Sequence, residues 1–428
     1  MINLDRKTAP GSLPIEAIQF LVVKKEVLQN GIPVYQINAG TQNIIKLELI
    51  FEAGHWNCKN PLLADFTNRM LIEGSLKYTS SEIAEKFDFY GTFYNFECGK
   101  HFASVQLYSL GNFFEKSIEI FESFVKFPTF PEREFKVHLK NDYQQYMLGR
   151  EKTELLAAEA FYSKIFGNKH PYGIITQAED FQKLSIEQLK LHHNQYYHPA
   201  ACKIIVAGLL DNTILEVLNK YFGGSDWPIG TKSIDRNFEF EKPGLDKFAI
   251  TKKGAAQASI RLGKRTISKH HEDYHGLSIV NTILGGYFGS RLMTNLREKS
   301  ALTYGIYSSL SSLLYSGVFS VAANVHSEQA ENAVNQIINE ISILREQLIS
   351  AKELEMVKNY LRGEMLRVFD GPLQVSEIYT GLLNFNLDFD YYQDYFDTIK
   401  SIQPENIREL ANKYLNTDSF TTVLAGNF

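Results

Sequence analysis

The sequence predicts an α+β fold made of two related domains, and three observations support this prediction. The chain has 428 residues, about twice the usual length of one domain. Residues 184–208 and 402–426 align without a gap at an offset of 218. A turn-rich stretch without hydrophobic periodicity, residues 223–244, separates the halves. We therefore assign residues 1–222 and 245–428 to two domains, with 223–244 as the linker.

The aligned segments each read as a helix, a short turn and a buried strand. Tyr196 aligns with Tyr414, and Ala207-Gly208 aligns with Ala425-Gly426. Because helix, turn and strand stay in register without a gap, duplication explains the match better than chance does.

A weaker correspondence lies earlier in each half. The strand-like segments Ile44–Phe51 and Ser259–Leu262 each precede a helical pattern, and the charged helices Glu132–Met147 and Ala351–Met365 then correspond. Each half therefore reads as strand, helix, strands, helices and a final strand. Duplicated domains often place a binding groove between them, and we expect one here.

Composition excludes several classes of protein. Hydrophobic residues make up 44% and charged residues 22%, which is typical of globular proteins and not of disordered chains. The net charge of −5 gives no basic footprint for nucleic acid. Three cysteines without paired spacing argue against a disulfide scaffold. No apolar run approaches the roughly 18 residues of a membrane span. We expect a cytoplasmic protein, unless an export signal has been trimmed from the start of the sequence.

Two stretches carry the motifs that matter for function. Leu62–Ser75 reads LLADFTNRMLIEGS, and Leu284–Tyr307 reads LGGYFGSRLMTNLREKSALTYGIY. The first resembles the helix that carries the inverted H-x-x-E-H motif in the pitrilysin/insulinase family of zinc peptidases, which includes the mitochondrial processing peptidases. The second is similar to the segment that carries the family's arginine/tyrosine pair. The resemblance spans residues 25–428 and implies two domains of the LuxS/processing-peptidase type, each a mostly antiparallel sheet packed with helices.

The zinc motif is degenerate in this sequence. The family uses two histidines four residues apart as ligands and a neighbouring glutamate as general base. The corresponding residues here are Asp65, Asn68 and Arg69, and an Asp/Arg pair at this spacing predicts a helical ion pair. The family's downstream glutamate falls at Tyr146, with Asp142 the only carboxylate nearby. The resemblance therefore implies no metal ligand and no cofactor in this chain.

The second motif is retained. Arg297 and Tyr304 are seven residues apart, about two helical turns, so they share a face if the segment is helical. The resemblance implies that both contact substrate and stabilise the transition state. A tyrosine hydroxyl can donate to an oxyanion, and an arginine can hold a carbonyl or carboxylate in its planar fork. The alternative is an arginine on a solvated helix face and a tyrosine in the core.

Further substrate contacts are implied by the resemblance. The segment Tyr90–Ser109 alternates as an edge strand does, and its family counterpart binds the substrate backbone by strand addition. Asn95 and Phe96 are the candidate residues there, with an ordinary sheet strand as the alternative. Gly285 and Gly286 belong to a run that borders the family's substrate cavity, with a flexible helix terminus as the alternative. Cys98 has no identifiable histidine partner, which favours a structural role.

A second zinc signature competes with this interpretation. His271 and His275 enclose a literal H-E-x-x-H, which places both imidazoles on one face if the segment is helical. The segment also falls where the second domain enters its first helix, and acidic residues are favourable in a first helical turn. We keep an autonomous zinc peptidase using these histidines as an alternative.

Together these features predict a non-zinc subunit of a zinc-dependent peptidase. Such a chain supplies the arginine/tyrosine pair in trans, while a zinc-bearing family subunit forms a heterodimer with it. A homodimer, and a catalytically inactive peptide-binding or scaffold protein of the same fold, are the alternatives. On its own the chain is expected to be inactive on its peptide substrate.

Overall fold

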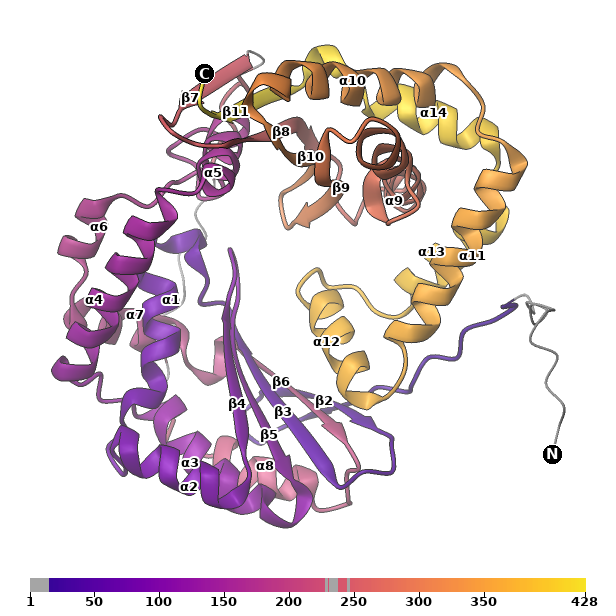
Figure 1. The fold of residues 1–428 in the computed structure, drawn as a ribbon. Helices are drawn as coiled ribbons and strands as arrows, with labels where there is room; N and C mark the ends of the chain where they lie inside the picture. Colours follow the sequence, from indigo (N-terminus) through magenta and orange to yellow (C-terminus); the bar gives the residue numbers. More distant parts are fainter. Residues whose placement is uncertain (1–14, 228–229, 231–237, 245–246) are drawn as a thin grey trace, which may run out of the picture.

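The computed structural model of the chain describes residues 15–227, 230, 238–244 and 247–428 (Figure 1). Residues 1–14 of the first predicted domain, part of the predicted linker and the first two residues of the second predicted domain lie outside the described residues. None of the described helices is long and apolar enough to cross a membrane.

Two sheets form the framework of the molecule, one in each half. In the first sheet the strand order is β1-β2-β6-β3-β5-β4, and in the second it is β7-β11-β8-β10-β9. One neighbouring pair in each sheet is parallel, β2 with β6 and β7 with β11, and the other pairs are antiparallel. The predicted α+β fold with two mostly antiparallel domains is confirmed. The strands are β1 (Lys24–Val27), β2 (Pro33–Asn38), β3 (Ile44–Phe51), β4 (Phe93–Cys98), β5 (Ala103–Leu110), β6 (Cys202–Gly208), β7 (Lys247–Thr251), β8 (Gln257–Thr266), β9 (Thr303–Leu313), β10 (Ser316–His326) and β11 (Thr421–Gly426).

The repeat seen in the sequence is also a repeat of structure. Helix α7 (Ile186–Tyr196) and helix α14 (Pro404–Tyr414) begin and end at residues related by the offset of 218. Strands β6 and β11 both end at the aligned glycines Gly208 and Gly426. Each strand pairs in the same direction with its neighbours in its own sheet, so the two halves share one topology.

Helices cover both sheets, and their ends follow local sequence signals. Thr79 and Glu82 form a capping box at the start of α2, and Gly91 ends that helix with a φ of 61°. The first half contains α1 (Leu63–Met70), α2 (Ser80–Tyr90), α3 (Phe114–Lys126), α4 (Glu132–Gly149), α5 (Thr153–Phe166), α6 (Ala178–Lys183), α7 and α8 (Ile214–Phe222). The second half contains α9 (Tyr274–Asn281), α10 (Ala330–Glu346), α11 (Ala351–Val368), α12 (Pro372–Leu383), α13 (Asp390–Ser401) and α14.

Each half donates one helix to the sheet of the other. Helix α5 of the first half packs against β8 and β11, and helix α12 of the second half packs against β2 and β6. Figure 1 shows α12 beside the first sheet and α5 beside the second. The α5 contact is an apolar cluster that includes Phe161, Ile165, Val318 and Val423. The halves are therefore joined by reciprocal packing as well as by the chain.

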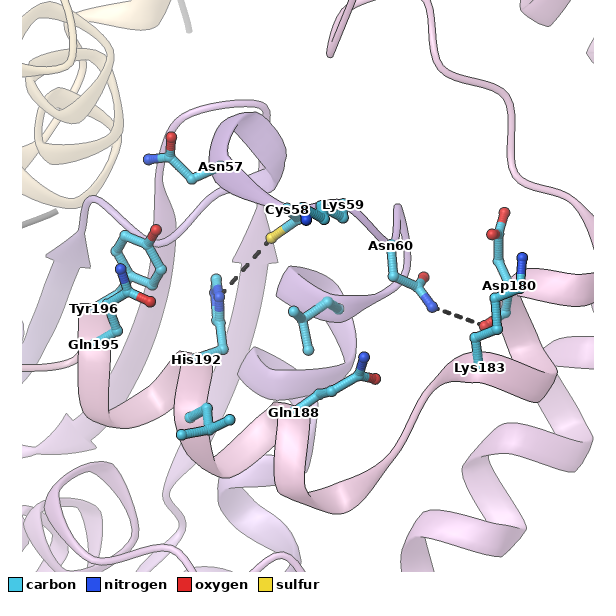
Figure 2. A pocket seen from close by; sticks show the side chains of 12 residues that line it. Asn57, Cys58, Lys59, Asn60, Asp180, Lys183, Gln188, His192, Gln195 and Tyr196 are labelled. Carbon is cyan, nitrogen blue, oxygen red and sulfur yellow. Dashed lines mark hydrogen bonds between the residues drawn. The ribbon is translucent and has the colours of Figure 1, made fainter. Parts of the chain in front are cut away.

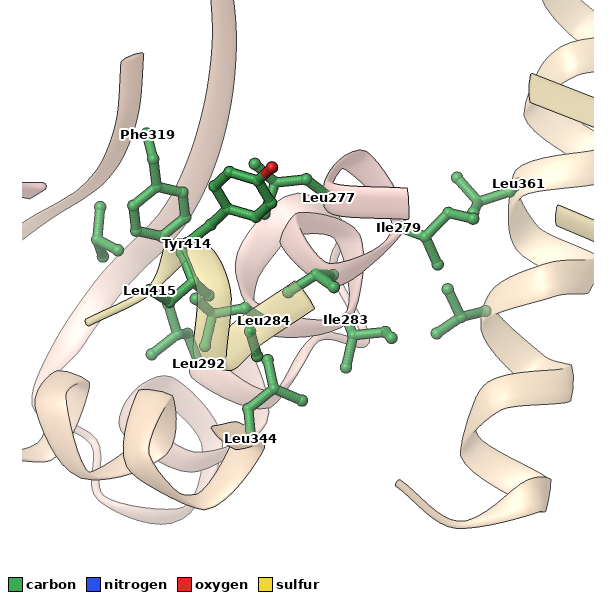
Figure 3. Packing of buried hydrophobic residues seen from close by; sticks show 14 of the residues in the cluster. Leu277, Ile279, Ile283, Leu284, Leu292, Phe319, Leu344, Leu361, Tyr414 and Leu415 are labelled. Carbon is green, nitrogen blue, oxygen red and sulfur yellow. The ribbon is translucent and has the colours of Figure 1, made fainter. Parts of the chain in front are cut away.

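A large hydrophobic cluster lies between the sheet and the helices of the second half (Figure 3). Leu277 and Leu284, which follow one another along the first helical region of this half, are fully buried there with Leu292 and Leu344. Burying a leucine side chain contributes about 1.5–3 kcal/mol, so this cluster is a main source of the stability of this half.

Candidate functional site

The degenerate zinc motif is closed by an internal ion-pair cluster. Arg69 lies one helical turn after Asp65, with 2.8 Å between its Nη2 and Asp65 Oδ2, and it also pairs with Asp142 on α4. Burial lowers the pKa of Arg69, but the hydrogen bonds and charges of Asp142 and Asp65 outweigh this effect and raise it. Tyr146, at the family's glutamate position, packs against Phe181. A fixed cation and its two counter-charges occupy the motif.

This donor set does not fit a zinc ion. The guanidinium of Arg69 has no lone pair for a metal, and it already pairs with both carboxylates. Within the described residues, no group of three or more His, Cys, Asp or Glu side chains is arranged to hold a metal ion.

Asn68, at the position of the general base, ties three elements together. Its Nδ2 donates to the carbonyl oxygens of Glu97 at 2.8 Å and Ser104 at 3.0 Å, and its Oδ1 accepts from the Tyr197 hydroxyl at 3.0 Å. The side chain is fully buried. An amide with all these bonds satisfied holds α1 against β4 and β5, and it cannot take a proton from water.

Arg297 and Tyr304 do not lie on one helix, so the helical condition for a shared face is not met. Arg297 lies on the π-helix η6 (Met293–Lys299), whose chain leaves the helix before Ala301, where φ is 49°. Tyr304 lies near the start of β9 and is 91% exposed, so the alternative that places the tyrosine in the core is wrong. The Arg297 guanidinium lies 4.9 Å from the ring centroid of Phe288.

Two π-helical segments precede β9, one of them containing Arg297, and the sequence did not predict either. They are η5 (Thr282–Gly286) and η6, and π-helices are rare and concentrate at functional sites. Gly285 is buried where η5 meets β9, and a Cβ there would lie 2.6 Å from the backbone nitrogen of Ser308. Gly286 is exposed. The glycine run was the available signal, because only glycine permits this close approach.

The candidate peptide-binding segment forms two strands, and β4 is the outermost strand of the first described sheet. Asn95 and Phe96 point to opposite faces, since side chains alternate along a strand. Asn95 donates to Glu97 Oε1 at 3.1 Å and to Gln106 Oε1 at 3.4 Å. Phe96 packs against the first hydrophobic core, with its ring centroid 5.8 Å from that of Tyr94. The two residues therefore have different surroundings.

Cys98 does have a histidine neighbour, contrary to the sequence prediction. Its Sγ lies 3.6 Å from His55 Nε2, a contact between residues far apart in the chain. Burial raises the pKa of Cys98, and burial together with the nearby Lys100 charge lowers the pKa of His55. Both groups are therefore neutral near pH 7. A protonated thiol beside a neutral imidazole is a weak nucleophile, which supports the structural role.

A polar pocket of about 420 Å³ lies between α1, α6 and α7 (Figure 2). Cys58 and His192 meet at its wall, with 3.9 Å between Sγ and Nδ1. Burial lowers the pKa of His192 to about 4. Its Nε2 lies 3.1 Å from the Ala53 carbonyl oxygen, whereas His193 Nε2 lies 2.8 Å from that of Val125. The adjacent imidazoles therefore serve different backbone groups.

The H-E-x-x-H segment is not one helical turn. Helix α9 begins at Tyr274, so only His275 lies on it, while His271 precedes the helix and accepts from the Asp273 backbone nitrogen at 3.1 Å. His275 stacks with Tyr395, whose ring centroid is 5.3 Å away, and contacts the tilted ring of Tyr391 at 4.4 Å. The helical condition for this zinc signature fails.

A cavity of about 250 Å³ lies where the two halves meet. Glu97 and His101 line it from the first half, and Ser312, Thr380 and Asn384 line it from the second. Glu97, which lines it, belongs to β4. The expected binding space between duplicated domains thus has a counterpart in the structure.

Comparisons with known proteins agree with this geometry. Residues 183–361 match the family model described as the Peptidase M16 inactive domain. The uncharacterized zinc protease YmxG of Bacillus subtilis is 24% identical over 81% of this chain and 84% of that protein. The probable inactive metalloprotease YmfF of the same organism is 24% identical over 57% of each chain. The crystal structure of a peptidase M16 inactive domain from Pseudomonas fluorescens has a TM-score of 0.87 and 25% identity, covering 95% of this chain and 99% of its own. The resemblance to the pitrilysin/insulinase family of peptidases is confirmed, and residues 183–361 of this chain are similar to the inactive domain of the M16 peptidases.

Proposed function

We propose that this chain is the non-zinc subunit of a zinc-dependent peptidase and supplies Arg297 and Tyr304 in trans to a zinc-bearing partner. The observation that carries the proposal is the contrast between the two halves. Arg69, held by Asp65 and Asp142, occupies the metal motif of the first half, whereas Tyr304 projects 91% exposed from β9 in the second half.

The chemistry of Arg297 and Tyr304 suits peptide hydrolysis. When zinc is bound in the partner, it supplies the activated water. In the proposed complex, the Tyr304 hydroxyl donates a hydrogen bond to the oxyanion that develops on the scissile carbonyl. The planar fork of Arg297 holds a substrate carbonyl or carboxylate. Strand β4 adds a backbone surface at which an extended peptide can pair.

Co-expression with an H-x-x-E-H family subunit tests the proposal. We expect a stable pair whose kcat/KM on a peptide substrate falls roughly a hundredfold in Tyr304→Phe, the effect of losing one oxyanion donor. Tyr307→Phe removes a hydroxyl from the same strand and is the matched control. Peptide hydrolysis by the purified chain alone, free of zinc, contradicts the proposal.

The alternative function is a catalytically inactive peptide-binding or scaffold protein. The similarity to YmfF, which is named a probable inactive metalloprotease, favours this alternative. The same experiment separates the two functions, because a scaffold forms its complexes without any dependence of peptidase activity on Tyr304. In that case Tyr304→Phe and Tyr307→Phe behave alike.

A further inference from the structure

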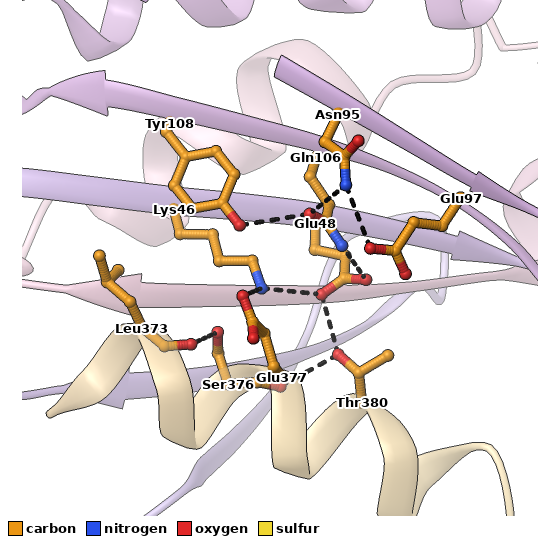
Figure 4. A network of polar contacts seen from close by, with 10 residues as sticks. All are labelled: Lys46, Glu48, Asn95, Glu97, Gln106, Tyr108, Leu373, Ser376, Glu377 and Thr380. Atoms are coloured by element: carbon orange, nitrogen blue, oxygen red, sulfur yellow. Dashed lines mark hydrogen bonds and ion pairs between the residues drawn. The ribbon is translucent and has the colours of Figure 1, made fainter. Parts of the chain in front are cut away.

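A buried polar row crosses the first sheet beneath the donated helix α12 (Figure 4). Lys46 and Glu48 on β3 are each 1% exposed, and Gln106 on β5 is 4% exposed. Lys46 Nζ lies 3.4 Å from Glu48 Oε2 and 3.7 Å from Glu377 Oε1 on α12. Thus two charged residues of the first half are buried under a helix of the second.

Burying this row costs stability that an apolar contact would not cost. Desolvating an ion pair costs several kcal/mol per ion, by order of magnitude, and the charge attraction repays it only with good geometry. Lys46 Nζ makes no hydrogen bond within the described part of the chain. Because burying this row costs stability, the row is expected to have a role beyond packing α12 against the sheet.

The row is continuous from α12 to the edge strand. Thr380 on α12 donates to Glu48 Oε2 at 2.8 Å, and Gln106 Nε2 donates to Glu48 Oε1 at 3.1 Å. Asn95 on β4 then donates to Gln106 Oε1 at 3.4 Å. Glu48, Gln106 and Asn95 are direct cross-strand neighbours in the register. One carboxylate of the first half thus connects a helix of the second half to the candidate peptide-binding strand.

The second half contains the reciprocal arrangement. Glu48 pairs with Ile205 on β6, and Arg261 on β8 pairs with Val423 on β11, which lies 218 residues after Ile205. Arg261 is therefore the counterpart of Glu48. Arg261 Nη2 lies 3.7 Å from Glu154 Oε1 on the donated helix α5, and its guanidinium lies 5.7 Å from the ring centroid of Tyr307 on β9. Tyr307 occupies the register position of Asn95.

A hydroxyl from the donated helix also recurs. Thr153 on α5 makes a 2.9 Å hydroxyl–hydroxyl hydrogen bond with Ser259, and the Ser259 hydroxyl donates to Asn324 Oδ1 at 2.6 Å. In both halves, therefore, a threonine of the donated helix bonds a buried polar side chain on the central strand. The two contacts are alike in kind, although the side chains and their register positions differ between the halves.

We infer that Thr380 and Glu48 are positioning residues that set the conformation of edge strand β4 from the opposite half of the molecule. The hydrogen bond from α12 fixes the Glu48 carboxylate, which orients Gln106 and through it Asn95. The peptide-pairing edge is then ordered only when α12 is seated on the first sheet. This inference rests on the proposed peptide-binding role of β4, which it deepens.

Hydrogen exchange of the whole chain tests the inference without any peptide. In Thr380→Val we expect the β4 amides that bond β5 to exchange roughly fivefold faster, the effect of losing one buried hydrogen bond. Thr380→Ser keeps the hydroxyl and should restore wild-type exchange. Ser376→Ala is the matched control, because its hydroxyl bonds only Leu373 of the same helix in the described residues.

The pattern along the chain decides the outcome. Faster exchange in β4 with unchanged exchange in the other edge strand, β1, supports positioning. Equal acceleration in both strands, or wild-type exchange of β4 in Thr380→Val, overturns the inference. Since no substrate is used, failure here leaves the proposed peptidase role standing. Failure of the Tyr304 experiment likewise leaves the exchange result unaffected.

Discussion

At the scale of single residues, the chain replaces metal coordination with hydrogen bonds and ion pairs. The sequence correctly predicts the Asp65–Arg69 pair from its spacing, since residues four apart meet on a helix. It does not predict that Asp142 completes the cluster, because that contact joins α1 to a helix more than seventy residues away. Likewise, spacing alone cannot reveal that Asn68 bonds Tyr197.

A neighbouring pair makes stability depend on pH. His138 Nε2 lies 2.8 Å from Glu73 Oε1. The hydrogen bond that His138 donates to Glu73 raises the pKa of His138 and lowers the pKa of Glu73. The histidine contribution is complete below its unfolded pKa of 6.5 and is lost as pH rises through the raised value. The glutamate contribution is complete above 4.5 and is lost as pH falls through the lowered value.

We therefore predict that His138→Gln destabilises the protein most between pH 4.5 and 6.5 and less on either side. Urea unfolding of wild type and variant at about pH 3–9, a range that spans both ordinary pKa values, measures the difference in unfolding free energy. Lys136→Gln is the control, because Lys136 is an exposed residue whose charge pairs with Glu132 on the same helix. A difference that does not vary with pH contradicts the assignment.

At the scale of elements, periodicity and repeats predict regular structure well, and close packing is what they miss. The gapless repeat predicts a helix followed by a strand in residues 184–208 and again in 402–426, and α7 with β6 and α14 with β11 lie there. The π-helical form of η6 was not predictable, because a π-helix has no period that a short sequence reveals. The sequence alone therefore could not decide whether the segment from Arg297 to Tyr304 is one helix, and the structure shows that it is not.

Glycine replacements test the packing of η5 against β9. Gly285→Ala places a methyl group 2.6 Å from the backbone nitrogen of Ser308, so we expect a loss of about 1–3 kcal/mol in unfolding free energy. Gly363→Ala, in the middle of α11 with open space around it, should instead stabilise by about 0.5–1 kcal/mol. Chemical denaturation of both variants measures the contrast, and equal effects contradict the packing argument.

At the scale of the whole molecule, the exchange of α5 and α12 makes each half incomplete without the other. The sequence predicts two domains from its duplication, but a repeat alone cannot show that a helix of each copy covers the other copy's sheet. The apolar contacts of Phe161 and Ile165 with the second sheet form only when both halves are folded. Folding of the halves should therefore be coupled.

We predict one cooperative unfolding transition for the full chain. Calorimetry should give a van't Hoff enthalpy close to the calorimetric enthalpy, as for a two-state domain. Phe161→Ala, which truncates a fully buried side chain of α5, should lower the single transition temperature without splitting it. Two separate transitions in the wild-type protein contradict the coupling.

The Arg69 cluster also has an evolutionary consequence. Returning a histidine at this position alone leaves Asp65 and Asp142 without their shared cation. Returning a glutamate in place of Asn68 alone places a carboxylate against the carbonyl oxygens of Glu97 and Ser104. Each single step back towards a metal site therefore lowers stability before any metal can repay it. A zinc site is therefore hard to reach from this sequence one mutation at a time, because the ion-pair cluster and the Asn68 hydrogen bonds both have to be given up.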